Sequence, residues 1–204
     1  MNTVIYVVRH AEVDNPENIE YMRLPGFGLS DWGRSQAEQL RDFFDDKKIN
    51  IIYSSPLDRT KETAKIIAHG KIKVEYSRNF IEANFKKWEG IKRSERPRSE
   101  VDGYYRDPMK YSAIFGESLS DIQKRVLEKL FVVIEKNKGK NIIIVTHASP
   151  LIVAMLFFMK RPLSDFSKIT VNYGGVATIT FDDELECKGV VYNEYVKQRA
   201  KNER

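Results

Sequence analysis

Cysteine is almost absent from the sequence, since Cys187 is the only one among 204 residues. A lone thiol excludes an internal disulfide framework and any zinc site built from cysteines. The first ten residues also lack the basic start and the small-residue cleavage site of a signal peptide. Both absences fit a reducing compartment, and we expect a cytoplasmic protein.

A hydrophobic run long enough to cross a membrane is missing too. Residues 141–159 carry no formal charge, but polar residues and Pro150 interrupt them, and the continuous apolar run at 151–159 has only nine residues. A membrane-spanning helix needs about 20 residues. A buried strand, a polar turn and a buried helix explain this stretch better, so we expect no membrane partner.

Charge of one sign is not in large excess. The sequence has 34 lysines and arginines against 29 acidic residues, a net charge of +5, and residues 195–204 carry +3 of it. The remaining excess is spread over the whole chain, which weakens the case for a nucleic-acid partner. The hydrophobic (42%) and charged (31%) fractions indicate a globular chain rather than a disordered one.

Internal repeats, low-complexity segments and linkers are absent, and strand patterns alternate with helix patterns. We expect strands at residues 3–9, 50–54, 72–76 and 141–146. We expect helices at residues 30–48, 56–69, 119–137 and 149–160. Residues 171–181 indicate closing strands and a hairpin. Residues 77–116, which are rich in charged and aromatic side chains, are expected to be irregular.

This order of elements predicts an α/β fold. It is a three-layer sandwich with a mainly parallel sheet, helices on both faces and one antiparallel edge element near the C-terminus. The length fits a single domain over residues 1–194, from which residues 77–116 form a lid-like excursion. A basic C-terminal tail follows at residues 195–204.

Two of the three histidines follow predicted strands. Arg9 and His10 end the first strand, His147 ends the strand at residues 141–146, and Arg59 lies just beyond the second strand. The carboxyl ends of parallel strands meet at one edge of a sheet, where such folds bind ligands. Two imidazoles and two guanidiniums, together with helix N-termini, suit a dense anion such as phosphate.

Five motifs, met in order along most of the chain, then carry a resemblance to a known family. They are Arg9-His10-Ala11-Glu12, Leu29-Ser30-x-x-Gly33-x-x-Gln36-Ala37, Ser54-Ser55-Pro56-x-x-Arg59-x-x-x-Thr63-Ala64, Glu82 followed by Trp88-Glu89-Gly90, and Thr146-His147. In these motifs the sequence resembles the histidine phosphatase superfamily, also called the phosphoglycerate-mutase-like family.

The resemblance implies a role for each matching residue. His10 is implied to be the nucleophile that becomes phosphohistidine, and Glu82 to protonate the leaving oxygen and then deprotonate the attacking water. The implied catalytic set is His10, Glu82 and His147, and the implied phosphate-binding set is Arg9, Arg59, His147 and Ala148. These groups replace the metal ions of other phosphoryl-transfer enzymes, so no metal and no cofactor are expected.

Asn15 and Arg23 are further candidates for substrate binding. The family's mutases often carry an asparagine six residues after the nucleophile, where this chain has Pro16, and Asn15 lies one residue earlier. Arg23 is a candidate to bind a second anionic group of the substrate. Glu89 lies in the same loop as Glu82 and is the competing acid, and we favour Glu82.

The predicted function is a metal-independent phosphomonoester hydrolase that acts through a phosphohistidine intermediate on a small phosphorylated metabolite. The compact region between Glu82 and His147 resembles that of the phosphatase members rather than that of the glycolytic mutases. Three alternatives stay open. They are a phosphoglycerate mutase, a protein phosphohistidine phosphatase, which the Arg-His-Ala start allows, and a non-catalytic module that binds phosphate or nucleic acid.

A basic and aromatic cluster at residues 86–98 allows three interpretations: a solvated charged face, a lid that attracts anionic substrates, or a nucleic-acid surface. We favour the first two and expect no nucleic-acid partner. The exposed aromatic residues of the lid-like excursion could also form a homodimer interface. His69 completes no metal-ligand spacing, and we place it only at the end of a helix.

Overall fold

Within residues 2–198, which the computed structural model describes, six strands form one mixed sheet in the order β3-β2-β4-β1-β5-β6. The strands are β1 (Thr3–Arg9), β2 (Ile49–Ser54), β3 (Val74–Tyr76), β4 (Asn141–Thr146), β5 (Gly175–Phe181) and β6 (Cys187–Glu194). Strands β1 to β4 run parallel, and β5 and β6 continue the sheet antiparallel. This confirms the predicted mainly parallel sheet with an antiparallel edge near the C-terminus.

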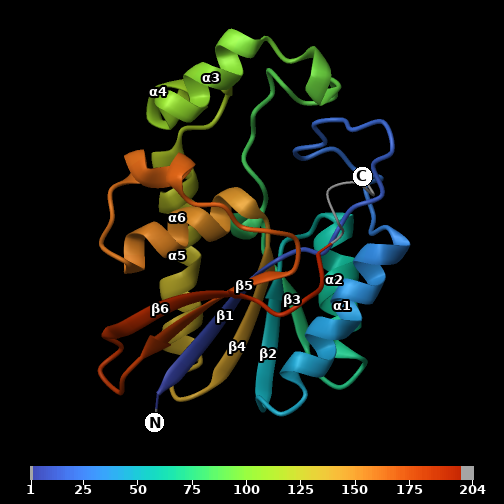
Figure 1. Ribbon diagram of the computed structural model, residues 1–204. Helices are drawn as coiled ribbons and strands as arrows, with labels where there is room; N and C mark the ends of the chain where they lie inside the picture. Colours follow the sequence, from blue (N-terminus) through green and yellow to red (C-terminus); the bar gives the residue numbers. More distant parts are fainter. Residues whose placement is uncertain (1, 199–204) are drawn as a thin grey trace.

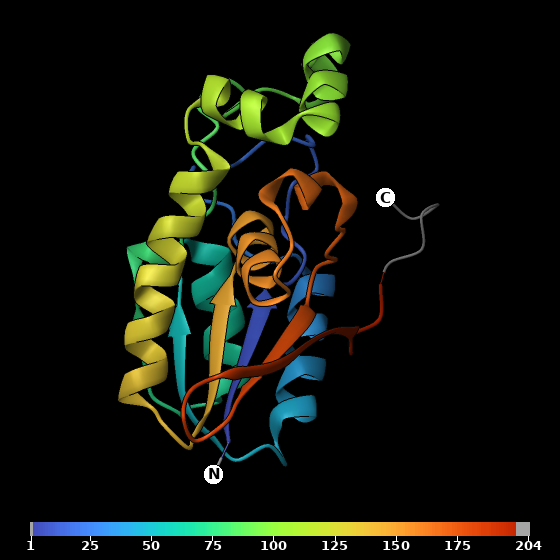
Figure 2. The ribbon, with the colours of Figure 1, turned by 90° about the vertical axis from the view of Figure 1, so that its left-hand side faces the viewer.

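Helices cover both faces of the sheet, which confirms the predicted three layers (Figure 1 and Figure 2). On one face lie α1 (Asp31–Phe44) and α2 (Asp58–Ala68), and on the other lie α5 (Leu119–Lys136) and α6 (Ala148–Phe158). The side chain of Ser30 accepts a hydrogen bond from the backbone N–H of Gly33 and so caps α1, as its position before the helix predicts.

The central strands alternate between the two cores. In β1, Ile5 and Val7 pack with α5 and α6, whereas Tyr6 and Val8 pack with α1 and α2. Successive side chains of a strand point to opposite faces, so a strand that is buried on both faces is apolar at every position. This is why β1 reads as one continuous hydrophobic run and lies at the centre of the sheet.

The start predicted for α2 is wrong. The helix predicted at residues 56–69 begins at Asp58, after Leu57, and Ser55-Pro56 lies before it. The backbone N–H of Ser55 instead donates to the carbonyl oxygen of Val145, which prolongs the pairing of β2 with β4. The strand pairing therefore extends one residue further and delays the helix.

The prediction that residues 77–116 are irregular is wrong. They contain the short 3-10 helices η1 (Arg78–Phe80) and η2 (Arg93–Glu95) and the helices α3 (Arg98–Arg106) and α4 (Pro108–Phe115). In Figure 1, α3 and α4 lie beyond the carboxyl ends of the central strands. Asp107 caps α4 by accepting the N–H of Lys110, with Pro108 in the first turn, which is a start signal that the many charges obscured.

Aromatic side chains hold this excursion together. The ring centroids of Trp88 and Phe115 are 4.2 Å apart, and Phe85 and Tyr104 meet edge to face at 5.5 Å. Trp88, Phe85 and Phe115 are buried and belong to the same core as α5 and α6. The excursion therefore has a packed interior of its own that continues into the main core.

The C-terminal residues return to the sheet. The ring of Tyr195 stacks on Phe43 of α1 with centroids 3.7 Å apart, and Val196 is buried in the core beside α1 and α2. The predicted basic tail at residues 195–204 thus begins with packed residues, and residues 199–204 lie outside the described part of the chain. The 3-10 helix η3 (Leu163–Lys168) connects α6 to the segment before β5.

The apolar stretch at residues 141–159 forms β4, a short polar turn and α6, as expected. Residues Ser149 to Leu156 of α6 are buried inside the protein. Across residues 2–198, no helix has both the length and the apolar character that crossing a membrane requires.

We predict that Gly33→Ala destabilises the protein. Gly33 lies in the first turn of α1, and an added Cβ would overlap the backbone carbonyl of Glu12. Backbone atoms cannot move aside as a flexible side chain can, so the free energy of unfolding should fall by about 1–3 kcal/mol. Urea denaturation followed by circular dichroism measures the change.

Gly189→Ala in β6 is the matched control, because nothing lies within 4 Å of the added Cβ there. Its free energy of unfolding should stay within about 0.5 kcal/mol of the wild type. Equal stability of the two variants would contradict the proposed close approach of α1 to the loop after β1.

Candidate active site

Adjacent strand ends place the two predicted histidines side by side. In the register of the pair β1 and β4, Arg9 lies opposite Thr146. The N–H of His10 then donates to the carbonyl oxygen of Thr146 at 2.9 Å. Both histidines leave their strands at the same level, and the ring centroids of His10 and His147 are 5.2 Å apart.

The contacts of His10 define its tautomer. Its Nδ1 lies 2.8 Å from the carbonyl oxygen of Ala11. A carbonyl oxygen only accepts hydrogen bonds, so Nδ1 carries the proton and Nε2 of the neutral ring keeps its lone pair. An imidazole held in this way presents a nucleophilic nitrogen at Nε2.

The surroundings keep both imidazoles neutral. The pKa of His10 and the pKa of His147 are lowered well below the usual value of 6.5. Burial is the largest cause because it disfavours the charged form, and the positive charges of Arg59 and Arg9 add to it. Ser55 holds His147 from the other side, with its Oγ 2.8 Å from Nε2 of the ring.

Both predicted arginines reach this point, one from β1 and one from the first turn of α2. Arg9 Nη1 donates to the carbonyl oxygen of Val171 at 2.8 Å, and Arg59 Nη2 donates to the carbonyl oxygen of Met22 at 2.6 Å. Arg59 is only 1% exposed, although no carboxylate is paired with it at salt-bridge distance within the described residues. Its guanidinium instead contacts the carbonyl oxygen of Met22 and the ring of Tyr21.

Several buried nitrogens at the site have no hydrogen-bond partner within residues 2–198. They are Nε of Arg9, Nε and Nη1 of Arg59, and Nδ1 of His147. Leaving a buried polar group unpaired costs about 1–3 kcal/mol, and more for a charged group. A tetrahedral oxyanion would offer acceptors to all of these nitrogens, so their arrangement suits a phosphoryl group.

Two tyrosine rings that the motifs did not identify pack against the arginines. The guanidinium of Arg9 lies 4.1 Å from the ring centroid of Tyr173, and that of Arg59 lies 4.7 Å from the ring centroid of Tyr21. The hydroxyl oxygens of the two tyrosines are 3.1 Å apart. These rings are far apart in the sequence and belong to no local motif, so only the fold reveals them.

The two hydroxyls differ in acidity. Burial raises the pKa of Tyr21 above its usual value. Burial also acts to raise the pKa of Tyr173, but the charges of Arg9 and Arg93 and the hydrogen bond with Tyr21 outweigh it and lower that pKa.

A cavity of about 160 Å³ opens at His10 and contains Glu82 among its lining residues, but not Glu89. Oε1 of Glu82 accepts the N–H of Ala83 at 2.8 Å and the N–H of Ser149, in the first turn of α6, at 3.3 Å. Glu89 has a different partner, because its Oε2 accepts a hydrogen bond from the backbone N–H of Arg23. Of the two acids, Glu82 is therefore the one beside the histidines.

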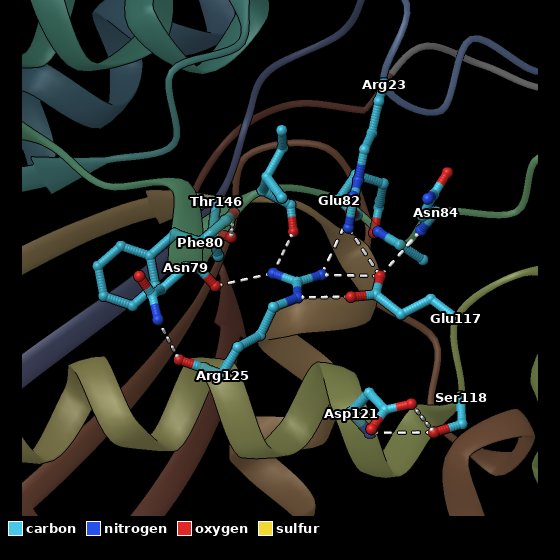
Figure 3. A network of polar contacts seen from close by, with 12 residues as sticks. Arg23, Asn79, Phe80, Glu82, Asn84, Glu117, Ser118, Asp121, Arg125 and Thr146 are labelled. Carbon is cyan, nitrogen blue, oxygen red and sulfur yellow. Dashed lines mark hydrogen bonds and ion pairs between the residues drawn. The ribbon is translucent and has the colours of Figure 1, made fainter.

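The candidates for substrate binding have structural partners. The Asn15 side chain bonds both the N–H and the carbonyl oxygen of Ile19, and it lines a second, polar cavity of about 850 Å³. Arg23 donates through Nε to the carbonyl oxygen of Glu82 and through Nη2 to Glu117, both at 2.7 Å (Figure 3). Ala148 begins α6 directly after His147.

The basic cluster contributes one residue to the site. Arg93 lines both cavities and pairs with the carboxylate of Glu20, which Arg96 also contacts at 2.6 Å. His69 lies away from the site as the left-handed residue that ends α2. Across residues 2–198, no three His, Cys, Asp or Glu side chains form a group that could hold a metal ion.

Comparison with known proteins gives consistent relatives. The family model "Histidine phosphatase superfamily (branch 1)" matches residues 5–193. Uncharacterized protein Rv0525 of Mycobacterium tuberculosis is 33% identical over 94% of this chain and 96% of its own. Phosphoserine phosphatase 1 of Hydrogenobacter thermophilus is 30% identical over 79% of both chains.

Solved structures share the fold. The structure of Bacillus stearothermophilus YhfR superposes with a TM-score of 0.82 at 27% identity, over 96% of each chain. Relatives by sequence also include a protein named 2,3-bisphosphoglycerate-dependent phosphoglycerate mutase, from Thermoplasma acidophilum, at 29% identity.

The lowered histidine pKa values predict how stability depends on pH. Between the folded and the unfolded pKa, the unfolded chain binds more protons, so the free energy of unfolding falls as the pH falls below about 6.5. His10→Asn removes one of the two groups. The variant should lose less stability between pH 7 and pH 5, by up to about 1.4 kcal/mol per pH unit.

Urea denaturation of both proteins at pH 7, 6 and 5 measures this difference in slope. The comparison uses the slopes rather than the absolute stabilities, because the substitution also changes packing. An unchanged slope in His10→Asn would show that His10 binds protons equally in the folded and unfolded states.

Proposed function

Because the chain belongs to the histidine phosphatase superfamily, branch 1, we propose that it is a phosphatase that hydrolyses phosphate monoesters of small metabolites through a phosphohistidine at His10. The observation that carries the proposal is the set of buried, unpartnered nitrogens of Arg9, Arg59 and His147 beside a neutral imidazole. A simple anion-binding site has no need of a nucleophile whose tautomer is fixed.

In the first step, Nε2 of His10 attacks the phosphorus atom and the bond to the ester oxygen breaks. The Nδ1–H···O=C bond to Ala11 keeps the ring oriented and stabilises the positive charge that develops on it. Arg9, Arg59 and the neutral ring of His147 bind the phosphoryl oxygens, and the positive charge of the two arginines stabilises the transition state.

The leaving oxygen needs a proton, and the attacking water of the second step must lose one. A single carboxyl group can do both in turn, as acid in the first step and as base in the second. Glu82 lines the same cavity as His10 and is the acid that we assign to this task. The products are the alcohol and inorganic phosphate.

The shape of the site supports a small substrate. The cavity at His10 has only about 160 Å³, and Arg93 connects it to the larger polar cavity beside Asn15. The name of one relative, phosphoserine phosphatase 1, refers to a substrate of this size. We therefore propose that the leaving group is a small polar metabolite, with Arg93 and Asn15 at its far side.

We predict that the wild type releases phosphate from 4-nitrophenyl phosphate in the presence of EDTA, and that His10→Asn lowers the rate at least about 10³-fold. The control is His69→Asn, because His69 is exposed at the end of α2 and asparagine tolerates its left-handed backbone. Labelled substrate should leave an acid-labile, base-stable phosphoryl group on the wild type and on His69→Asn, but not on His10→Asn.

Two outcomes would overturn the proposal. Primer-dependent interconversion of 2- and 3-phosphoglycerate that outruns phosphate release would make the protein a mutase. Binding of inorganic phosphate without turnover of any ester would make it a binding module.

A further inference from the structure

The segment that carries Glu82 is not a strand of the sheet, so no ladder of backbone hydrogen bonds holds it. After β3 ends at Tyr76, the chain makes only the single turn η1 before it reaches the site. Its backbone carbonyls need donors from elsewhere, because buried carbonyl oxygens are almost always paired. Thr146 of β4 donates to the carbonyl oxygen of Phe80 at 2.6 Å, and an arginine side chain of α5 donates to three others.

Arg125 lies in α5 and spreads its guanidinium along this segment (Figure 3). Nη1 donates to the carbonyl oxygens of Asn79 and Ile81, both at 2.8 Å, and Nη2 donates to that of Glu82 at 3.2 Å. In the same helix turn, the carbonyl oxygen of Arg125 accepts the side-chain N–H of Asn79 at 3.0 Å. One planar group thus fixes the segment at three of its carbonyls.

Glu117, two residues before α5, holds Arg125 in place. Its carboxylate accepts two hydrogen bonds from Arg125, from Nε to Oε1 at 2.8 Å and from Nη2 to Oε2 at 3.2 Å. Oε2 also accepts the N–H of Asn84 at 2.9 Å, so the same carboxylate secures the chain on the other side of Glu82.

Arg23 completes the group from the loop after β1. It donates to Glu117 and, through Nε, to the carbonyl oxygen of Glu82, which thereby has two donors. The side chains of Arg125, Glu117 and Arg23 are 18%, 15% and 26% exposed. Charge-assisted bonds that are largely withdrawn from water are stronger than surface pairs.

We propose that Arg125, Glu117 and Arg23 form a clamp that positions Glu82 as the proton donor and acceptor of the reaction. The inference rests on the proposed function, in which Glu82 is the acid. The clamp fixes the backbone on both sides of Glu82. The side chain is held only through Oε1, by the N–H groups of Ala83 and Ser149. Oε2 takes part in neither bond and is the oxygen that meets the ester.

The clamp also explains why Arg23 carries charge so close to the site. Its Nε and Nη2 both donate to protein groups. This assigns Arg23 to positioning Glu82 rather than to binding a second anionic group of the substrate. The neighbouring carbonyl oxygen, that of Met22, accepts Nη2 of Arg59. One loop therefore connects the acid to the phosphate-binding arginine.

A positioning role has a signature that loss of stability does not share. An alkyl phosphate needs a proton on its leaving oxygen, whereas dinitrophenolate leaves readily as the anion. In the first step, misplacing Glu82 should therefore lower kcat/KM for an alkyl ester and spare kcat/KM for 2,4-dinitrophenyl phosphate. General acid catalysis typically contributes about 10²–10⁴-fold, which sets the range of the effect.

The experiment compares kcat/KM for the two esters in the wild type, Arg125→Lys, Glu117→Gln and Glu82→Gln, because kcat/KM reports the steps up to departure of the leaving group and not the hydrolysis of the phosphohistidine. Lysine keeps the charge of Arg125 but cannot span three carbonyls, and glutamine keeps the shape of Glu117. We expect each clamp variant to lose at least about tenfold on the alkyl ester and less than about threefold on the dinitrophenyl ester. Glu117→Gln is the milder change and tests the clamp even if the Arg125→Lys protein does not fold.

Two further measurements separate the clamp from general structural damage. In the Glu82→Gln background, Arg125→Lys should cost less than about twofold on the alkyl ester, because a residue that acts through Glu82 has nothing left to position. Arg161→Lys is the matched control. Arg161 is paired with Asp165 at 2.9 Å outside the clamp, and its substitution should change neither rate by more than about twofold.

Equal losses on both esters, or additive effects with Glu82→Gln, would overturn the clamp while the wild-type turnover still supported the phosphatase. A wild type that hydrolyses neither ester would overturn the proposed function and, with it, the role of the clamp. The structure predicts that Arg125→Lys loses activity on the alkyl ester alone, and that it causes no further loss when Glu82 is already glutamine.

Discussion

The hydrogen-bonded register between the ends of β1 and β4 is the constraint on which the site depends. Because Arg9 lies opposite Thr146, His10 and His147 leave neighbouring strands at one level and their rings meet. A shift of one residue would turn every side chain of β1 to the other face, since the side-chain period of a strand is two. The two buried cores fix that register, so core packing and site geometry are one requirement.

Around these histidines the protein concentrates positive charge in a place that excludes water. Burial and the arginines act in the same direction on the imidazoles and lower their pKa values, which keeps them neutral. The same arginines retain donor groups without partners. The site is thus less stable than it would be with those donors satisfied, and the phosphoryl group that we propose as its ligand would reverse that loss. This tension between stability and ligand binding is typical of functional sites.

The acid comes from a different part of the chain and is held in a different way. Whereas strand pairing fixes His10 and His147, side chains hold the Glu82 segment. Thr146 of β4 donates to it, and Arg125, Glu117 and Arg23 hold it on both sides of Glu82. Helix α5, which carries Arg125, also packs against the sheet. One helix therefore links the main core to the segment that we propose performs proton transfer.

The sequence alone determined the layers and the ends of the central strands. Continuous apolar strands and amphipathic helices state which faces are buried, and that information is local. It also placed Arg9, His10 and His147 at the sheet edge, since they lie at the ends of strands.

The sequence did not reveal α3 and α4, where charges and aromatic residues obscure the periodicity. It also did not reveal the true start of α2, which strand pairing delays. Only the tertiary structure decided which groups meet across long distances in the chain, such as Tyr21 with Tyr173 and Arg125 with the Glu82 carbonyl. Those pairings depend on packing between separate elements, and no pattern of neighbouring residues records them.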